Sequence, residues 1–338
     1  MAATVAVMGA GSWGTAFAQL CHDAGEDTVL WARRQEIADE INQQHTNEAY
    51  LPDTVLPEPI GATSDPAEAL DGAEVVVLAI PSIHLEGQLD AWAAAIPGES
   101  TLVSLIKGVD VESRRFGSQI ITDAIDCEPD RVVVVSGPNL AKECVERLPA
   151  ATVAASPDRD RAERVQSAVM TPYFRVYTNP DKVGVEIGGA VKNVIALAAG
   201  ISHGMGFGDN TKATVITRGL AEMQRLGVAM GGDPLTFAGL AGVGDLVATC
   251  TSSKSRNRTV GEKLGRGMEL DEIIDQMNMV AEGVKSSQAI VEIAREQGVE
   301  MPISEGIVKV VHEGLDPRTM VKELMSREAK PEIYGIDR

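Results

Sequence analysis

The chain has 338 residues, 44% of them hydrophobic, and a formal net charge of −19 at pH 7. That size and composition are enough for two domains with sizeable cores, and they exclude a disordered chain. The strong acidity argues against general binding to nucleic acid or to anionic membranes, which require basic protein surfaces. The four cysteines are far apart and the five histidines show no metal-ligand spacing, so we expect reduced thiols and no bound metal.

The N-terminus begins with a strand-like run, TVAVMGAG, and shows no basic segment followed by an apolar one. A secretory signal is therefore not expected. No stretch of about 18 residues is both apolar and free of charge, which predicts no membrane span. Together with the reduced cysteines, these features predict a cytoplasmic protein without stable membrane insertion.

Apolar runs of strand length alternate with helical patterns in the first half of the chain. The strands are predicted at 4–9, 28–32, 74–80, 100–106, 131–137, 151–156 and 174–178, and helices at 12–24, 66–71 and 112–126. The runs are rich in β-branched residues and nearly continuous, as expected for parallel strands covered on both faces. This alternation predicts an α/β fold with a doubly wound, mostly parallel sheet.

The pattern changes after Pro180, where helical periodicity replaces the strand-like runs. Two clear helical candidates are DNTKATVITRGLAEMQRLGVAMG and SSQAIVEIAREQG. We therefore predict two domains: residues 1–181 with the sheet, and an all-helical domain over residues 182–338.

A glycine motif, GAGSWG, follows the first predicted strand and opens a helix. In that context Gly9 permits a tight turn, Gly11 lets a pyrophosphate approach the backbone, and Gly14 lets helix and strand pack closely. The motif therefore predicts a dinucleotide site, the alternative being an ordinary glycine-rich turn.

The second predicted strand ends in LWARR, which places Arg33 and Arg34 where NAD-specific sites usually carry an acidic residue for the ribose. Guanidinium groups suit a 2′-phosphate through bidentate hydrogen bonds. This favours NADP(H), with NAD(H) as a possible alternative cofactor. A solvated basic turn is the other interpretation.

The segment GGAVKNVIALAAGI, residues 188–201, is apolar on almost every side yet contains Lys192 and Asn193. Such a helix is normally buried, and a buried ammonium is costly unless it is paired or its pKa falls. One alternative is a lysine whose stem is buried while its ammonium reaches the surface.

Other polar residues follow predicted strand ends or lie in a glycine- and serine-rich stretch. Lys107 follows one strand, and Gly137, Pro138 and Asn139 follow another. The stretch GLAGVGDLVATCTSSKSRNR combines a carboxylate with guanidinium and amide donors, which suit a phosphate and hydroxyl groups. By spacing alone, a solvated loop is the favoured interpretation of both Lys107 and the group Asp245, Thr249, Ser255, Arg256 and Asn257, and a binding site is the alternative.

Together these stretches resemble the bacterial-type NAD(P)-dependent glycerol-3-phosphate dehydrogenases. GAGSWGTA, NEAYLP, SGPNLAKE, GGAVKNVIALAAGI, NTKATVITRGLAEM, GVGDLVATCT and SRNR occur in the order expected for that family. The resemblance implies a Rossmann-like domain, an all-helical substrate domain, and reversible reduction of dihydroxyacetone phosphate to sn-glycerol 3-phosphate, which supplies glycerophospholipid synthesis.

The resemblance also implies roles for single residues. Lys192 matches the catalytic lysine that exchanges a proton at the substrate carbonyl, Lys107 matches a second active-site lysine, and Asp245 and Thr249 lie near the reacting group. Substrate contacts are expected from Lys107, Gly137, Asn139, Lys192, Asp245, Ser255, Arg256 (on the phosphate) and Asn257. Cofactor contacts are expected from Gly9, Gly11, Ser12, Trp13, Gly14, Arg33, Arg34, Lys107, Ala141, Arg256, Val280 and Glu282.

The chain departs from the family pattern at two places. Asn139 and Leu140 stand where the family usually has Ser or Thr followed by Phe, and Ile106 stands where it often has Thr. An asparagine still donates a hydrogen bond, so we expect the contact at position 139 to persist. Neither change affects the proton-transfer group.

The residues themselves agree with that chemistry. Hydride transfer to a ketone builds negative charge on its oxygen, which a nearby ammonium stabilises and protonates. Burial lowers a lysine pKa, a second cation such as Lys107 lowers it further, and Asp245 opposes the shift.

Two other functions are weighed against this one. A 3-hydroxyacid or ketopantoate reductase shares the two-domain build but does not need the SRNR run. A non-catalytic NADP(H) sensor does not need Lys192, Asp245 and Arg256 together.

No tyrosine starts a Tyr-x-x-x-Lys motif, which argues against a short-chain dehydrogenase. Apolar faces in the helical domain make a homodimer plausible.

Overall fold

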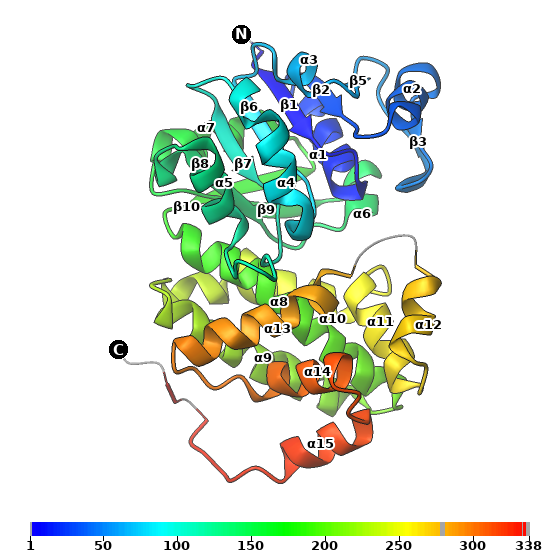
Figure 1. Ribbon diagram of the computed structural model, residues 1–338, viewed down its shortest axis with the longest axis vertical. Coiled ribbons are helices and arrows are strands. Elements are labelled where there is room, and N and C mark those ends of the chain that lie inside the picture. Colours follow the sequence, from blue (N-terminus) through cyan, green and yellow to red (C-terminus); the bar gives the residue numbers. More distant parts are fainter. Residues whose placement is uncertain (1, 278–280, 333, 336–338) are drawn as a thin grey trace. The chain divides into compact units, whose positions relative to one another are not determined.

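The computed structural model describes residues 2–277, 281–332 and 334–335, and its chain divides into two compact units (Figure 1). The first unit comprises Met1–Ile106 and Phe116–Lys182, and the second comprises Lys107–Arg115 and Val183–Arg338. Residues 107–115, called the 107–115 segment below, therefore belong to the second unit although they are flanked in sequence by the first. Which unit binds cofactor and which binds substrate stays a prediction.

The first unit is built on an eight-stranded sheet with the order β10-β9-β8-β7-β6-β1-β2-β5. Every neighbouring pair is parallel except β8 with β9. From β5 to β8 the order is that of a dinucleotide-binding Rossmann sheet, which confirms the predicted α/β fold. The strands are β1 (Thr4–Met8), β2 (Asp27–Trp31), β5 (Gly61–Thr63), β6 (Val75–Leu78), β7 (Thr101–Ser104), β8 (Val132–Ser136), β9 (Ala150–Ala155) and β10 (Phe174–Asn179).

Helices cover both faces of this sheet. Alternate residues of β1 belong to different cores: Val5 and Val7 to one cluster, Ala6 and Met8 to the other. Because side chains alternate across a strand, the two clusters lie on opposite faces, which explains the nearly continuous apolar strands. The helices are α1 (Ser12–Asp23), α2 (Gln35–Gln44), α3 (Pro66–Leu70), α4 (Ser82–Trp92), α5 (Gly117–Ile125), α6 (Ala141–Val145) and α7 (Arg159–Val169).

The helix predicted over 112–126 begins later than expected, at Gly117. Asp110 organises the residues before it into a loop, because its Oδ1 accepts hydrogen bonds from the backbone N and the hydroxyl of Ser113, both at 2.8 Å. Arg114 then adopts a left-handed conformation with φ of 55°. The Gln119 side chain accepts a bond from the Phe116 backbone N at 2.9 Å and marks the helix start. The local turn at Asp110 thus outweighs the helical pattern of the sequence.

A small antiparallel hairpin, β3 (Thr46–Asn47) and β4 (Leu51–Val55), is a second feature that the periodicity did not predict. Strand β3 has only two residues, and β4 contains Pro52 and buries only Leu51, so neither strand shows an apolar pattern in the sequence.

All elements of the second unit are helical among the described residues. They are α8 (Lys182–Gly204), α9 (Asp209–Ala229), α10 (Asp245–Thr251), α11 (Arg256–Gly265), α12 (Leu270–Asp275), α13 (Glu282–Glu296), α14 (Pro302–His312) and α15 (Pro317–Met325), with a 3₁₀ helix at Pro234–Ala238 and a π-helical turn at Leu240–Gly244 before α10. Helix α8 is long and apolar enough to cross a membrane, yet its apolar stretch is wholly buried in the protein. It is the central core helix of this unit.

Helices α8 and α11 meet backbone to backbone through glycines. A Cβ added to Gly200 on α8 would lie 2.1 Å from the Arg258 carbonyl oxygen, and one added to Gly261 on α11 would lie 2.1 Å from the Leu197 carbonyl oxygen. Only glycine permits such an approach. The contact holds the N-terminal half of α11 against the part of α8 that follows Lys192 and Asn193 by about one to two turns.

Candidate active site

The glycine turn of the first unit lies between the ends of β1 and β6, where the strand order reverses direction. Gly9 has a φ of +127°, and a Cβ on it would lie 2.6 Å from the Ala79 carbonyl oxygen. A Cβ on Gly14 would lie 1.9 Å from the Gly9 carbonyl oxygen, whereas one on Gly11 would meet nothing within 4 Å. Two glycines therefore serve the packing, and the third faces open space where a pyrophosphate can approach.

The start of α1 suits an anion. Its N-cap residue is Gly11, which has no side chain with which to cap the first-turn amides. The indole Nε1 of Trp13 is buried and has no hydrogen-bond partner among the described residues. A helix N-terminus capped by glycine and a buried indole donor fit a phosphate-bearing nicotinamide dinucleotide.

Asn47 stabilises the glycine turn, a role that sequence reasoning missed. Its buried Nδ2 donates to the Ala10 carbonyl oxygen at 3.0 Å and to the Thr15 hydroxyl at 2.9 Å. The Ser12 hydroxyl donates to the Tyr50 carbonyl oxygen at 2.7 Å. Asn47 is the first residue of the motif NEAYLP, and that motif is the signal for it in the sequence.

Arg33 and Arg34 lie just beyond β2 and are both exposed. Arg34 stacks on the Tyr50 ring, with its guanidinium carbon 5.8 Å from the ring centroid, and lies 3.7 Å from a Glu36 carboxylate oxygen. Within the described part of the chain Arg33 has no ion-pair or hydrogen-bond partner. Both cations are therefore accessible to a ligand.

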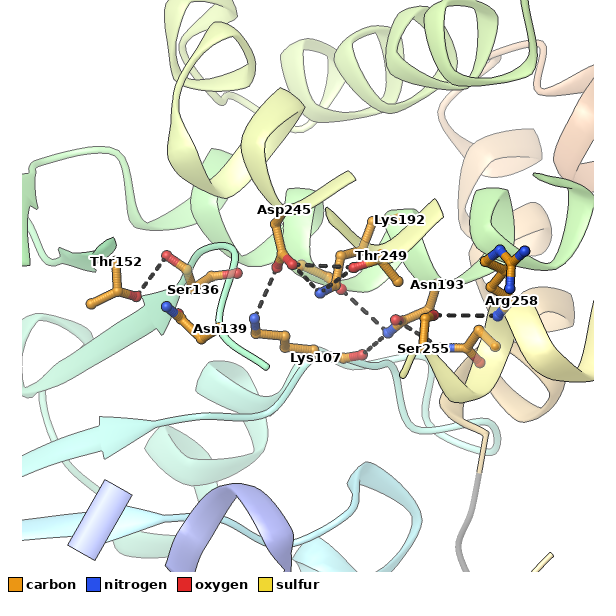
Figure 2. A network of polar contacts seen from close by, with 12 residues as sticks. Lys107, Ser136, Asn139, Thr152, Lys192, Asn193, Asp245, Thr249, Ser255 and Arg258 are labelled. Carbon is orange, nitrogen blue, oxygen red and sulfur yellow. Dashed lines mark hydrogen bonds and ion pairs between the residues drawn. The ribbon is translucent and has the colours of Figure 1, made fainter. Parts of the chain in front are cut away.

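In the second unit, three of the predicted catalytic residues, Lys192, Lys107 and Thr249, converge on the carboxylate of the fourth, Asp245 (Figure 2). Lys192 Nζ contacts Oδ1 of Asp245, and Lys107 Nζ donates to the other oxygen, Oδ2, at 2.8 Å. Thr249, one turn along α10 from Asp245, accepts a hydrogen bond from Lys192 Nζ at 3.0 Å. The side chain of Lys192 is 8% exposed, that of Asp245 2% and that of Lys107 16%. The ammonium of Lys192 is thus buried and paired.

The charges in this cluster set its protonation. Burial lowers the pKa of Lys192, the carboxylate of Asp245 opposes that shift, and the ammonium of Lys107 adds to it, which leaves the pKa at about 7. Burial would raise the pKa of Asp245, but the charges of Lys107 and Lys192 outweigh it and hold the pKa below its usual range. The carboxylate therefore stays ionised while Lys192 exchanges a proton near neutral pH.

Asn193 and Asn257 form a hydrogen-bond relay behind the cluster. Asn193 Nδ2 donates to the Lys107 carbonyl oxygen at 2.7 Å, and Asn257 Nδ2 donates to Asn193 Oδ1 at 2.9 Å. The backbone N of Gly283, at the start of α13, donates to Asn257 Oδ1 at 3.0 Å. The sequence assigns Asn193 no chemical step, only partners beside Lys192, and in the structure its amide holds the backbone of Lys107.

The other predicted site residues lie at the ends of elements. Ser255 caps α11, since its hydroxyl oxygen accepts a bond from the Arg258 backbone N at 3.3 Å, and Arg256 is exposed in the first turn of that helix. Glu282 begins α13, and Val280 lies outside the described residues. In the first unit Gly137 follows β8 and Ala141 begins α6.

Asn139 also lies in the first unit and uses only part of its amide. Its Nδ2 donates to the Ala151 carbonyl oxygen at 3.0 Å, while its Oδ1 is buried without a hydrogen-bond partner among the described residues. Leu140 follows it as the N-cap residue of α6. Whether Asn139 contacts substrate stays a prediction.

Known proteins resemble this chain over nearly its whole length. The family profile described as NAD-dependent glycerol-3-phosphate dehydrogenase N-terminus matches residues 4–162, and the C-terminus profile matches residues 181–322. A Streptomyces griseus protein named glycerol-3-phosphate dehydrogenase, NAD(P)+, is 57% identical over 327 residues, which cover 97% of each chain. The crystal structure of the glycerol-3-phosphate dehydrogenase from Coxiella burnetii is 34% identical, with a TM-score of 0.91 over 96% of this chain and 99% of that one.

A ketopantoate reductase from Ralstonia eutropha is 16% identical, with a TM-score of 0.58 over 96% of this chain and all of that one, and shares the fold alone. The two family profiles and the 57% identical relative favour glycerol-3-phosphate dehydrogenase over ketopantoate reductase. The chain belongs to the NAD-dependent glycerol-3-phosphate dehydrogenase family.

Proposed function

We propose that Lys192 is the general acid and base with which this enzyme reduces dihydroxyacetone phosphate reversibly to sn-glycerol 3-phosphate. The observation that carries the proposal is a buried ammonium with a pKa of about 7, held by Asp245 and Thr249. A bound nicotinamide cofactor supplies the hydride in reduction and accepts it in oxidation. As the carbonyl oxygen gains charge, Lys192 gives it a proton, and in the reverse reaction the neutral amine takes that proton back.

The neighbours of Lys192 support this step in different ways. Lys107 brings a second positive charge to the same carboxylate and stabilises the developing alkoxide. Asp245 keeps both ammonium groups in place, and Thr249 fixes the direction of the Lys192 ammonium. Asn193 holds Lys107 through its backbone.

Arg256 and the first turn of α11 are proposed to bind the substrate phosphate. Arg256 is exposed at the N-terminal end of the helix, where backbone amides and the helix dipole favour an anion. Binding of the non-reacting phosphate supplies energy that positions the carbonyl for reaction. Ser255 and Asn257, on either side of Arg256, are proposed to contact the same substrate, as are Gly137 and Asn139.

The reaction is tested by following oxidation of NADPH, and separately of NADH, with dihydroxyacetone phosphate. We expect turnover that depends on this ketone, and product identified as sn-glycerol 3-phosphate. Ketopantoate and 3-ketoacids serve as controls. Turnover of one of those controls without turnover of dihydroxyacetone phosphate would contradict the proposal.

The pKa of Lys192 sets an expected pH dependence. With a pKa of about 7, the ammonium that reduction needs is present below pH 7 and is lost as the pH rises. Reduction should therefore slow above about pH 7, while oxidation of glycerol 3-phosphate, which needs the neutral amine, should speed up over the same range. Initial rates in both directions between pH 5 and pH 9 check this, and parallel profiles in the two directions would speak against Lys192 as the shared group.

We further propose that NADP(H) is preferred, because two accessible guanidinium groups follow β2 where a ribose phosphate would lie. Replacing Arg33 and Arg34 together by alanine should lower kcat/KM for NADPH about tenfold or more and leave that for NADH within about twofold. Arg175→Ala, an exposed arginine of β10, is the matched control. An unchanged NADPH/NADH ratio in the double variant would refute the preference.

The setting of the reaction is proposed from the same chemistry. Glycerol 3-phosphate is the backbone of glycerophospholipids, so we propose that a cytoplasmic enzyme supplies it for their synthesis, acting as a homodimer and without nucleic-acid partners.

A further inference from the structure

The 107–115 segment is attached to helix α13 at both of its ends. At its start, a chain of three hydrogen bonds links the segment to α13. The chain runs from the backbone N of Gly283, in the first turn of α13, through the side chains of Asn257 and Asn193 to the Lys107 carbonyl oxygen. At its far end, the guanidinium of Arg114 lies 2.5 Å from Glu296 and 3.9 Å from Glu292. Gly283 and Glu296 are 13 residues apart on α13, which corresponds to about 20 Å along the helix. One rigid helix therefore holds the segment at two widely separated points.

The conformation of Arg114 shows that the segment is shaped to make this contact. Its φ of 55° lies in the left-handed region, which is unfavourable for a residue with a long side chain. The turn is closed by a bond from the Arg114 backbone N to the Asp110 carbonyl oxygen at 3.0 Å. Between the two anchors, Val109 is completely buried. The segment is thus a compact loop, so a movement of the backbone at Arg114 should also move the backbone at Lys107.

We propose that Arg114 is a positioning residue for the reaction, whose ion pairs with Glu292 and Glu296 keep the 107–115 segment on the second unit and the Lys107 ammonium on Asp245. The inference rests on the proposed roles of Lys107 and Lys192. Arg114 itself is 44% exposed and touches none of the reacting groups. It acts through Lys107, whose side chain spans from the segment to the carboxylate.

Loss of the Arg114 ion pairs should change the pKa of Lys192, and a loss of general stability would not have that effect. Lys192 contacts Asp245 and Thr249, and Lys107 shares the carboxylate. The thiol of Cys250 beside them stays neutral, since burial raises its pKa to about 12. Because Lys107 lowers the pKa of Lys192, withdrawal of Lys107 should raise that pKa and move the fall in reduction rate to higher pH.

The first experiment replaces Arg114 by glutamate, which places like charges together on α13. We expect kcat/KM for dihydroxyacetone phosphate to fall about tenfold, the fall in reduction rate to move to higher pH, and the melting temperature to change little, because exposed ion pairs contribute weakly to stability. Arg295→Glu reverses a neighbouring exposed charge on α13 and should leave both rate and pH profile as in the wild type. Adding Glu296→Arg to Arg114→Glu restores a pair of opposite charge and should recover most of the rate.

The second experiment places Arg114→Glu in a Lys107→Ala background. If Arg114 acts through Lys107, the second substitution should lower kcat/KM by less than about twofold further. An undiminished tenfold loss in that background, or an unmoved pH profile in Arg114→Glu alone, would overturn the inference. Wild-type rates in Lys107→Ala would overturn both the proposed role of Lys107 and this inference. If Lys107→Ala loses activity while Arg114→Glu keeps wild-type activity, only the inference about Arg114 is overturned.

Discussion

Replacement of Lys192 by alanine is expected to lower kcat for dihydroxyacetone phosphate reduction by about 10²- to 10⁴-fold, the usual contribution of a positioned proton donor. The loss follows because Lys192 is the cluster's ammonium with a pKa of about 7, and its role cannot pass to the Asp245 carboxylate, whose pKa is held low. The fold should survive, because Asp245 keeps its ion pair with Lys107 after the change. Turnover, NADPH binding by fluorescence and the melting temperature are the measurements.

Lys192→Arg is the matched variant for that experiment. Arginine preserves the positive charge beside Asp245 but holds its proton throughout the accessible pH range. If proton transfer is the role of Lys192, this variant should also be slow, and its rate should no longer change around pH 7. Near-normal turnover in either variant would remove Lys192 from the mechanism.

Replacement of Asp245 by asparagine should damage both activity and stability. Two ammonium groups would then face each other without a carboxylate, and removal of one member of a buried charge cluster costs about 3–5 kcal/mol. Lys107 is 16% exposed and can turn toward water, so a loss near 3 kcal/mol is expected. Because Asp245 raises the pKa of Lys192, its loss should lower that pKa and move the fall in reduction rate to more acidic pH.

Urea unfolding and pH–rate profiles of Asp245→Asn test these two effects. Asp209→Asn is the matched control, since Asp209 also pairs with a lysine, Lys212, but its side chain is 97% exposed. That control should change neither the unfolding free energy appreciably nor the pH profile. A stability loss in Asp245→Asn no larger than in the control would show that the buried charges are not held by this carboxylate.

The elements that could be predicted from the sequence are those whose signal is local. The continuous β-branched runs became parallel strands because both faces of the sheet are covered, and the glycine motif fits its turn because Gly9 and Gly14 admit no Cβ. The burial of Lys192 could be read from its apolar neighbours, since a helix apolar on every side has no solvated face.

What could not be predicted depends on contacts between residues far apart in the sequence. The relay from Gly283 through Asn257 and Asn193 joins three distant segments, and an asparagine in a helix gives no sign of its partner. The start of α5 was misplaced because the turn around Asp110 and Arg114 overrides a helical pattern. Substrate and cofactor contacts remain predictions by resemblance.

The membership of the 107–115 segment in the second unit limits how this enzyme can be recombined with its relatives. A chimaera joined at residue 182 would take Lys192 and Asp245 from one parent and Lys107 and Arg114 from the other. The 107–115 segment of one parent would then have to fit, by chance, the residues on α8, α10 and α13 of the other parent that contact it. A functional exchange of the helical unit must therefore transplant two stretches, the short one inserted between β7 and α5 of the host sheet together with the long C-terminal one.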